Sequence, residues 1–234
     1  YILLLNPDTV VLNGAIDRLV DFAEKHPEAG IFGGRTVFGD GSVNPTSCWR
    51  APSLWGFLCR ALGLDSYFQS SSLLNRDAYG GWQRDSVRES DIVSGCFLLI
   101  RREIWEELGG FDRDFFMYAE DWDLCLRARQ AGYRCLFCPD AEIIHYGGAS
   151  EPALEGKMVR LIETKARLCR KHDSRLAAWL SVRLLDLWVL NRLVGYSVLG
   201  LLNPSTRPKY ACWRRVWDQR RQWWRDDPQA DRSS

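Results

Sequence analysis

The sequence predicts an α/β fold, a mostly parallel sheet sandwiched by helices, followed by a helical extension. Over residues 1–150, apolar strand-like runs alternate with helical patterns, which is the order of strands joined by helical crossovers. From about residue 151 onward only helical patterns occur. We therefore expect a sheet domain over residues 1–150 and a helical extension over residues 151–234.

Composition and charge suit a globular protein without a preference for nucleic acid. Of the 234 residues, 46% are hydrophobic, and the net charge is +1. The eight cysteines are irregularly spaced and several lie in apolar runs, which predicts buried, reduced thiols. Cys135 and Cys138 form a Cys-x-x-Cys pair, but a second pair of zinc ligands at suitable spacing is missing.

The first part of the chain predicts a strand, a helix and a second strand. Residues 1–5 are continuously apolar, which is typical of a buried parallel strand. Because a protein rarely begins inside its core strand, we expect an N-terminal portion with the first strands of the sheet to precede them. Asn13 is expected to cap a helix over 14–26. A strand over 30–38 then leads into an Asp40-Gly41 turn.

The middle of the chain predicts a long loop over 48–90, rich in Pro, Ser and Gly. A strongly apolar strand over 91–101 follows, and a short helix over 102–108. A further helix is expected over 120–131, and two last strands lie at about 133–138 and 141–146.

Three helices are expected in the extension, over 153–172, 174–202 and about 208–226. The second is apolar but carries Arg183 and Asp186 near its middle, which argues against a transmembrane span. An amphipathic helix at a membrane surface fits better. Arg and Trp in the last helix suit an interface with anionic lipids. Packing of these helices on the domain, or in a dimer, is the alternative.

Three segments carry candidate chemistry. Asp8 follows the first strand, where a carboxylate either holds a divalent cation or caps a turn. Glu120, Asp121 and Asp123 open a helix, where negative charge is favourable anyway, and capping is the preferred interpretation for Asp123. For Asp121, neighbouring aromatic side chains predict desolvation, a raised pKa and a better general base. His145 ends a late strand, as a hydrogen-bonded structural residue or a metal ligand.

If Asp8, Asp121 and His145 face the same sheet edge, a metal carboxylate, a general base and a second ligand converge. Such a set suits displacement of a diphosphate from an anomeric carbon. Taken together and in order, the motifs resemble GT-A family 2 of inverting glycosyltransferases, bacterial rhamnosyltransferase-like members in particular. The resemblance rests on residues 3–8 (LLLNPD), 93–101 (VSGCFLLIR), 109–112 (GGFD), 116–127 (FMYAEDWDLCLR) and His145.

The resemblance implies roles for individual residues. Asp8 matches the second acidic position of the DxD motif, which binds Mg²⁺ or Mn²⁺ on the sugar nucleotide, and Asn6 stands at the first. His145 matches a further metal ligand. Asp121 matches the general base, with Glu120 beside it. Substrate contacts are implied for three residues, Ser94, Gly95 and Trp122.

The implied reaction is a single in-line displacement that inverts the anomeric configuration. A sugar, with rhamnose as the family-based expectation, moves from a nucleoside-diphosphate sugar to a saccharide or lipid-linked saccharide in cell-surface polysaccharide synthesis. The expected location is cytoplasmic, peripheral on the inner face of the plasma membrane. Residues 219–223 (QRRQW) depart from the Gln-x-x-Arg-Trp motif of processive synthases, so we expect one sugar per encounter.

Three alternatives stay open at this stage. A glycoside hydrolase would use two carboxylates without nucleotide or metal. A non-catalytic, membrane-associated glycan-binding module would follow from the missing nucleotide-binding strands, without which the chain is expected to be inactive by itself. Nucleic-acid binding through the Arg- and Trp-rich tail is disfavoured by the near-neutral total charge.

Overall fold

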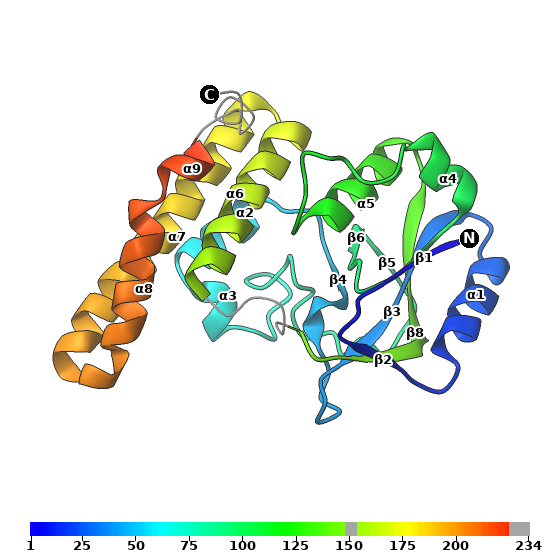
Figure 1. The fold of residues 1–234 in the computed structure, drawn as a ribbon, viewed down its shortest axis with the longest axis horizontal. Coiled ribbons are helices and arrows are strands. Elements are labelled where there is room, and N and C mark those ends of the chain that lie inside the picture. Colours follow the sequence, from blue (N-terminus) through cyan, green and yellow to red (C-terminus); the bar gives the residue numbers. More distant parts are fainter. Residues whose placement is uncertain (148–153, 225–234) are drawn as a thin grey trace. The chain divides into compact units, whose positions relative to one another are not determined.

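The computed structural model describes residues 1–147 and 154–224, which divide into two compact units (Figure 1). Within the described residues, the first unit consists of 1–51, 70–116 and 120–147, and the second of 52–69, 117–119 and 154–224. The predicted boundary between residues 150 and 151 lies outside the described residues. The sequence did not predict that 52–69 and 117–119 join the helical unit.

The first unit is built on a six-stranded sheet in the order β1-β7-β3-β8-β2, with β5 also pairing with β8. A separate two-stranded sheet is formed by β4 and β6. The strands are β1 (Ile2–Leu5), β2 (Thr9–Val11), β3 (Ala29–Val37), β4 (Cys48–Trp49), β5 (Arg88–Ser90), β6 (Ile92–Val93), β7 (Phe97–Ile100) and β8 (Arg134–His145).

The α/β class is confirmed, but the expectation of a mostly parallel sheet is wrong. Among the described strands, β3 and β8 are parallel, whereas β1–β7, β3–β7, β2–β8 and β5–β8 are antiparallel. Helices cover both sheet faces, so even antiparallel strands are apolar on both sides and resemble parallel ones in sequence. This resemblance explains the wrong expectation for β1. The strand was expected to be buried and parallel, but it is half-buried and antiparallel to β7.

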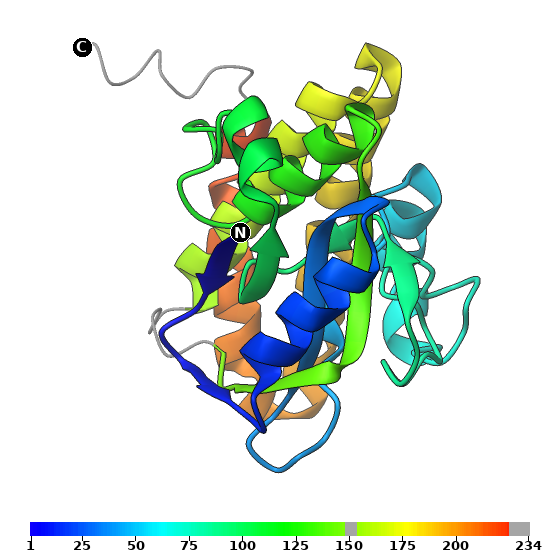
Figure 2. The same ribbon diagram turned by 90° about the vertical axis from the view of Figure 1, so that its right-hand side faces the viewer.

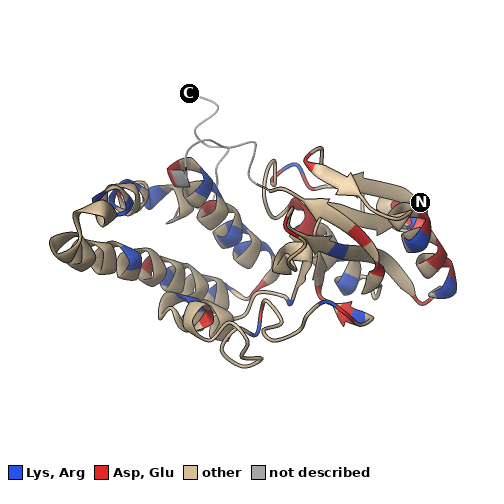
Figure 3. Ribbon diagram, turned by 90° about the horizontal axis from the view of Figure 1, so that it is seen from below, with Lys and Arg blue, Asp and Glu red and all other residues tan. Residues whose placement is uncertain are grey.

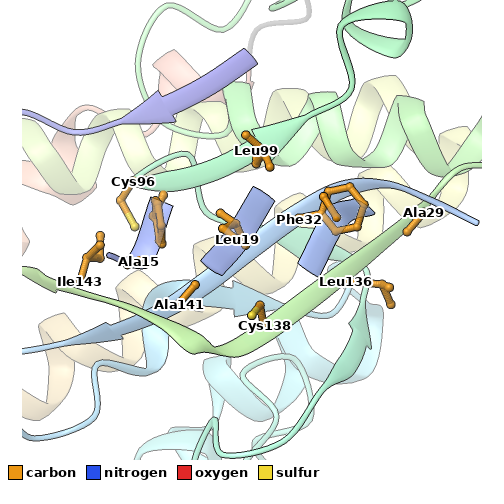
Figure 4. Packing of buried hydrophobic residues seen from close by; sticks show 12 residues of the cluster. Ala15, Leu19, Ala29, Phe32, Cys96, Leu99, Leu136, Cys138, Ala141 and Ile143 are labelled. Carbon is orange, nitrogen blue, oxygen red and sulfur yellow. The ribbon is translucent and has the colours of Figure 1, made fainter. Parts of the chain in front are cut away.

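Helices cover the two faces of this sheet, as predicted. On one face α1 (Ala15–Lys25) packs Leu19 against Phe32 and Leu99 (Figure 4). Figure 2 shows α1 lying across the strands. The other face holds α4 (Arg102–Glu107) and α5 (Glu120–Gln130), where Leu124 joins a cluster with Ile31 and Leu98. Neighbouring residues of each strand thus enter opposite clusters, as the pleat requires.

Gly34 of β3 lies where a side chain does not fit, and its replacement is our first prediction. A Cβ there would meet the Ala141 carbonyl oxygen and the Phe97 ring. We expect Gly34→Ala to lower the free energy of unfolding by about 1–3 kcal/mol, measured by urea denaturation. The control is Gly195→Ala, in a helix and with open space around it. It should raise stability by about 0.5–1 kcal/mol. Equal effects of both changes would contradict the packing argument.

Several element boundaries differ from prediction. The expected loop over 48–90 contains β4, β5, α2 (Leu54–Ala61) and α3 (Leu64–Tyr67). Ser53 caps α2, because its hydroxyl accepts a hydrogen bond from the Gly56 N–H at 3.0 Å. The expected strand over 91–101 is divided into β6 and β7, and the two expected last strands form one strand, β8.

Asn13 does not cap α1, contrary to prediction. Its backbone is left-handed (φ 46°), and Gly14 (φ 68°) precedes the helix without a side-chain cap. Both residues are used to turn the chain from β2 into α1, which leaves the Asn13 side chain badly placed for capping.

The second unit is helical, as the extension was predicted to be. It contains α2, α3, α6 (Leu154–His172), α7 (Arg175–Leu202), the 3₁₀ turn η2 (Pro204–Thr206), α8 (Arg207–Asp218) and α9 (Arg221–Trp224). The expected last helix over 208–226 is therefore two helices, α8 and α9, within the described residues. Asp186 of α7 accepts hydrogen bonds from the indole N–H groups of Trp223 and Trp224, both at 2.9 Å, which fastens α9 to α7.

The cysteines are free, as predicted. Seven are buried and Cys212 is partly exposed. Cys135 and Cys138 lie on β8 as strand thiols in the sheet.

Candidate active site

The site begins in the turn that follows β1. The Asn6 N–H donates to the Cys96 carbonyl oxygen at 3.2 Å, and the Thr9 hydroxyl donates to the Asn6 carbonyl oxygen at 2.7 Å. These bonds fix the turn against β7 and direct the chain into β2. Asp8, the last residue of the turn, is held in place by its own carbonyl oxygen, which accepts from the Tyr146 N–H at 3.1 Å.

Strand register brings His145 to the same turn. Thr9 of β2 lies opposite His145 of β8. The His145 Nε2 atom is 3.3 Å from the Asp8 Oδ1 atom and 3.3 Å from the Asn6 Nδ2 atom. The side chains of Asp8 and His145 are only 25% and 14% exposed. The structure therefore brings together the three residues for which the sequence predicted diphosphate and metal contacts.

The chemistry of these groups fits a divalent cation. The His145 Nδ1 atom is buried without a hydrogen-bond partner among the described residues, so the ring makes its polar contacts through Nε2. Two adjacent ligands of an octahedral cation lie about 3 Å apart, close to the spacing from Asp8 Oδ1 to His145 Nε2. Asn6 can present its amide oxygen in place of nitrogen by rotating about its side chain.

No group of three or more His, Cys, Asp or Glu side chains suited to a metal was found within residues 1–147 and 154–224. A cation at Asp8 and His145 would therefore need further ligands of another kind. Mg²⁺ commonly takes one or two protein ligands and completes its shell with water and substrate phosphates.

Asp121 occupies the first turn of α5 and is half-buried. Its Oδ2 atom accepts a hydrogen bond from the Gly95 N–H at 2.7 Å, and its Oδ1 atom accepts from the Trp122 N–H at 2.8 Å. Burial raises the pKa of the Asp121 carboxyl, and the two N–H bonds partly oppose this. The carboxylate is thus fixed in orientation and made more basic than an exposed aspartate.

The connection Ser94–Cys96 between β6 and β7 links both halves of the site. Its Gly95 N–H holds Asp121, and its Cys96 carbonyl oxygen holds Asn6. The pKa of the Cys96 thiol is raised to about 12, chiefly by burial, and the negative charges of Asp121 and Asp8 act in the same direction. The two hydrogen bonds therefore hold Asp121 and the turn that carries Asp8 against the same short segment.

Gly95 also permits the close approach of Asp121. A Cβ at Gly95 would lie 3.2 Å from the Asp121 Cβ and 3.5 Å from its Oδ2. A side chain there would crowd the carboxylate, so this position contributes to the site through its backbone.

Glu120 differs from Asp121 in its surroundings. Burial, with a contribution from the charge of Asp121, raises the Glu120 pKa to about 7. Its Oε2 atom is buried without a hydrogen-bond partner among the described residues. Two left-handed residues precede it, Tyr118 (φ 66°) and Ala119 (φ 65°), a strained backbone of the kind found at functional sites.

The raised pKa of Glu120 predicts a pH-dependent effect of Glu120→Gln on stability. In the unfolded chain the Glu120 carboxyl ionises near pH 4.5, whereas in the folded protein it keeps its proton to about pH 7. The stability that the Glu120 carboxyl contributes is therefore fully present below pH 4.5, and it is lost as the pH rises through about 7. After allowance for solvent screening, the variant should be about 1–2 kcal/mol more stable than the parent at high pH.

Urea denaturation at pH 4 and pH 8 measures this effect. Asp21→Asn, on the exposed surface of α1, is the control and should change stability little at either pH. A gain from Glu120→Gln that is the same at both pH values would contradict the assigned pKa.

Trp122 and Asp123 have visible structural roles. The Trp122 ring packs 5.1 Å from the Trp49 ring, and its predicted contact with substrate stays a prediction. Asp123 was expected to act as a cap. It is instead fully buried and pairs with Arg127 at 2.7 Å. The Arg127 guanidinium also donates to the carbonyl oxygens of Leu108 and Gly110, both at 2.7 Å.

The sequence analysis did not single out Arg127. Its spacing of four residues from Asp123 on a helix is the signal that would have found the pair. The Ser94 hydroxyl, expected to face the acceptor, accepts a bond from the Cys96 N–H at 3.4 Å, so its substrate role stays a prediction as well.

Comparison with known proteins identifies the family. The family model described as "Glycosyltransferase like family 2" matches residues 1–164. The chain belongs to glycosyltransferase family 2. This family 2 chain contains the whole cluster from Asn6 to His145 inside the matched region.

Two of the curated relatives of this family 2 chain are named as rhamnosyltransferases. It is 31% identical over 153 residues to the N-acetylglucosaminyl-diphospho-decaprenol L-rhamnosyltransferase of Mycobacterium tuberculosis, covering 62% of this chain and 47% of the relative. It is 30% identical over 178 residues to the rhamnosyltransferase WbbL of Escherichia coli K12, covering 73% of this chain and 62% of the relative. The chain thus spans about half to three-fifths of the length of these relatives.

Among solved structures, this family 2 chain is similar to the mannosyltransferase PcManGT from Pyrobaculum calidifontis in complex with GDP-Man and Mn²⁺. The identity is 13% and the TM-score 0.49, with 96% of this chain and 62% of that chain covered.

Proposed function

We propose that the protein transfers a sugar from a nucleoside-diphosphate sugar to an acceptor hydroxyl with inversion at the anomeric carbon. The observation that supports this most is the pair of polar groups around Ser94–Cys96. A half-buried, oriented carboxylate, Asp121, accepts a hydrogen bond from Gly95, and Asp8 with His145 lies in the turn that the Asn6 N–H fastens to Cys96. A base and a diphosphate site beside one backbone segment are what a one-step displacement requires.

On the donor side, Asp8 and His145 would hold a divalent cation, with Asn6 next to them. When bound, Mg²⁺ or Mn²⁺ supplies positive charge that stabilises a departing diphosphate. The chain's own contribution is to hold the carboxylate and the imidazole together, through the β2–β8 register and the bond from the Tyr146 N–H to the Asp8 carbonyl oxygen.

On the acceptor side, Asp121 takes the proton from the attacking hydroxyl. Its two backbone hydrogen bonds fix the carboxylate plane, and its burial raises the proton affinity. The hydroxyl oxygen forms the new bond to the anomeric carbon, the bond to the diphosphate oxygen breaks with its electron pair, and the proton ends on Asp121. Glu120, beside it, is uncharged below about pH 7 and so adds little repulsion there.

The named activities of the relatives suggest the substrates. We propose L-rhamnose, carried on deoxythymidine diphosphate, as the donor sugar. An acceptor with a sugar attached through diphosphate to a polyprenol, as in the mycobacterial relative's name, is the first to test. The reaction would then serve cell-surface polysaccharide synthesis. The protein would lie peripherally on the cytoplasmic face of the plasma membrane.

To test this, the purified full-length protein, with any residues that precede position 1, is incubated with a panel of sugar nucleotides and a lipid-diphosphate N-acetylglucosamine acceptor, in Mg²⁺, Mn²⁺ or a chelator. We expect product only with a divalent cation, and nuclear magnetic resonance should show an inverted anomeric configuration. Asp8→Ala should lose activity, whereas Asp21→Ala on the exposed surface of α1 should keep it.

Other outcomes would separate the alternatives. Turnover that persists in chelator and in Asp8→Ala would contradict the proposed cation site. A retained configuration excludes the one-step displacement. Release of free sugar from a glycan without nucleotide would favour the hydrolase, and acceptor binding with no turnover under any condition would favour the binding module.

A further inference from the structure

The second half of α7 exposes an apolar surface that the helical unit leaves uncovered. Ala178, Val182, Leu185 and Val189 of the first half are buried in the core of this unit. The second half is different, because Leu201 is 83% exposed and Leu202 80% exposed. We define the hairpin tip as residues 190–209, where α7 turns through η2 into α8. Its exposed apolar side chains are Leu190, Val194, Val198, Leu199, Leu201 and Leu202.

The charge around the hairpin tip has one sign. The hairpin tip contains three basic side chains, Arg192, Arg207 and Lys209, and no Asp or Glu. Figure 3 agrees, since α7 and α8 are tan and blue where they connect. Arg207 and Lys209 are exposed directly after η2. A cationic rim on an apolar tip is complementary to a surface that is anionic outside and apolar beneath.

A neighbouring segment of the same unit adds aromatic side chains to this surface. The Asn191 amide donates to the Ala61 carbonyl oxygen at 2.7 Å, and Arg192 donates to the Ser66 hydroxyl at 3.4 Å. These bonds hold the end of α2 and α3 beside the start of the tip. Tyr67 in α3 is 85% exposed and Phe68 52% exposed. Aromatic side chains of this kind concentrate at the headgroup level of membranes.

By length and composition alone, α7 could cross a membrane. Its packing argues for a shallower position. Asp186 is nearly buried and bonded to two tryptophans, so the first half of α7 is committed to the protein core. The exposed part, residues 190–202, extends over about 20 Å at 1.5 Å per residue. That is shorter than the roughly 30 Å hydrocarbon core of a bilayer.

We infer that the hairpin tip docks on the surface of an anionic phospholipid bilayer. Leu201 and Leu202 enter the boundary between headgroups and acyl chains, while Arg207 and Lys209 contact the phosphates. This arrangement is that of interfacial helices, in which buried apolar area and attraction to anionic lipid add together. The inference is independent of the proposed sugar transfer.

The experiment measures co-sedimentation of the purified protein with vesicles of phosphatidylcholine, with and without about one third phosphatidylglycerol. Binding should require the anionic lipid and should be released by high salt, because the charge contacts are at the surface. Two double variants test the two parts of the surface, Leu201→Ser with Leu202→Ser, and Arg207→Glu with Lys209→Glu. Circular dichroism checks that both keep the helical fold.

We expect the leucine pair to weaken binding by about tenfold per residue. The charge pair should weaken binding to anionic vesicles by at least about fivefold per residue. The matched controls lie in the other unit. Leu73→Ser replaces a leucine that is 62% exposed, and Lys25→Glu reverses an exposed charge on α1. Both should bind as the parent does.

Three outcomes would overturn the inference. Equal binding to neutral and anionic vesicles would show that the charge contacts do not contribute. Unchanged binding in both double variants would show that the hairpin tip is not the membrane contact. A self-association seen by analytical ultracentrifugation, and lost in the leucine pair without any vesicle binding by the parent, would instead assign the surface to a second copy of the chain. Transfer to a detergent-solubilised acceptor should be unaffected by these variants, which keeps this test separate from that of the proposed activity.

Discussion

Asp121→Asn is expected to lower turnover by about 10²–10⁴-fold, because it removes the proposed general base. The loss should appear in kcat, while KM for the sugar nucleotide changes little. A base acts in the transition state, and the donor is proposed to bind through Asp8 and His145 instead. Steady-state kinetics at saturating acceptor measures the effect.

The folded structure should survive this change. Asn keeps one oxygen that accepts a backbone N–H, and it removes a partly buried charge. The other bond, from Gly95 or Trp122, is lost at a cost of about 0.5–1.5 kcal/mol. Because these effects oppose each other, we expect the free energy of unfolding to change by only about 1 kcal/mol. Asp21→Asn on the surface of α1 is the matched control for activity.

The pH profile gives a second measurement on Asp121. A base works only when ionised, so the parent's turnover should rise with pH through the raised pKa of Asp121. The residual activity of Asp121→Asn should lack that rise. Unchanged turnover in Asp121→Asn, or an unchanged pH profile, would remove the base role and leave Glu120 as the carboxylate to test.

The site was more predictable from sequence than the sheet that carries it. The placement of Asp8, His145 and Asp121 depends on where a strand ends and a helix begins, and both are marked locally by apolar runs that stop at polar residues. Strand direction is set by distant partners. Nothing within residues 1–5 or 97–100 specifies that β1 and β7 run antiparallel, so the predicted parallel sheet was wrong.

Roles that depend on tertiary partners were also missed. Asp123 and Asp121 stand two residues apart in the same acidic helix start, and the sequence analysis expected a cap at Asp123 and a base at Asp121. The fold separates them, because Gly95 meets Asp121 and Arg127 meets Asp123. The helix α2 was also not predicted from the sequence. Its Ser53 cap is a local signal, but it lies in a segment whose Pro, Ser and Gly content is typical of loops.

The buried pair of Asp123 and Arg127 leads to the prediction with the largest effect on stability. Arg127 bonds Asp123 and two carbonyl oxygens at the end of α4, so it ties α5 to the turn at Gly109 and Gly110. Asp123→Ala would leave this guanidinium, only 18% exposed, without its carboxylate. Removing one partner of such a buried pair typically costs about 3–5 kcal/mol, and we expect that loss in urea denaturation.

A double-mutant cycle separates the pair from simple loss of packing. Asp123→Ala and Arg127→Ala together should cost less than the sum of the two single changes, by about 0.5–3 kcal/mol, since the second change removes the unpaired charge. The control pair is Arg102 and Glu106, 3.9 Å apart and about two-thirds exposed, where Glu106→Ala should cost less than about 1 kcal/mol. Strict additivity at Asp123 and Arg127 would show that the two side chains stabilise α5 independently. The ion pair would then not be what fixes the helix that presents Asp121.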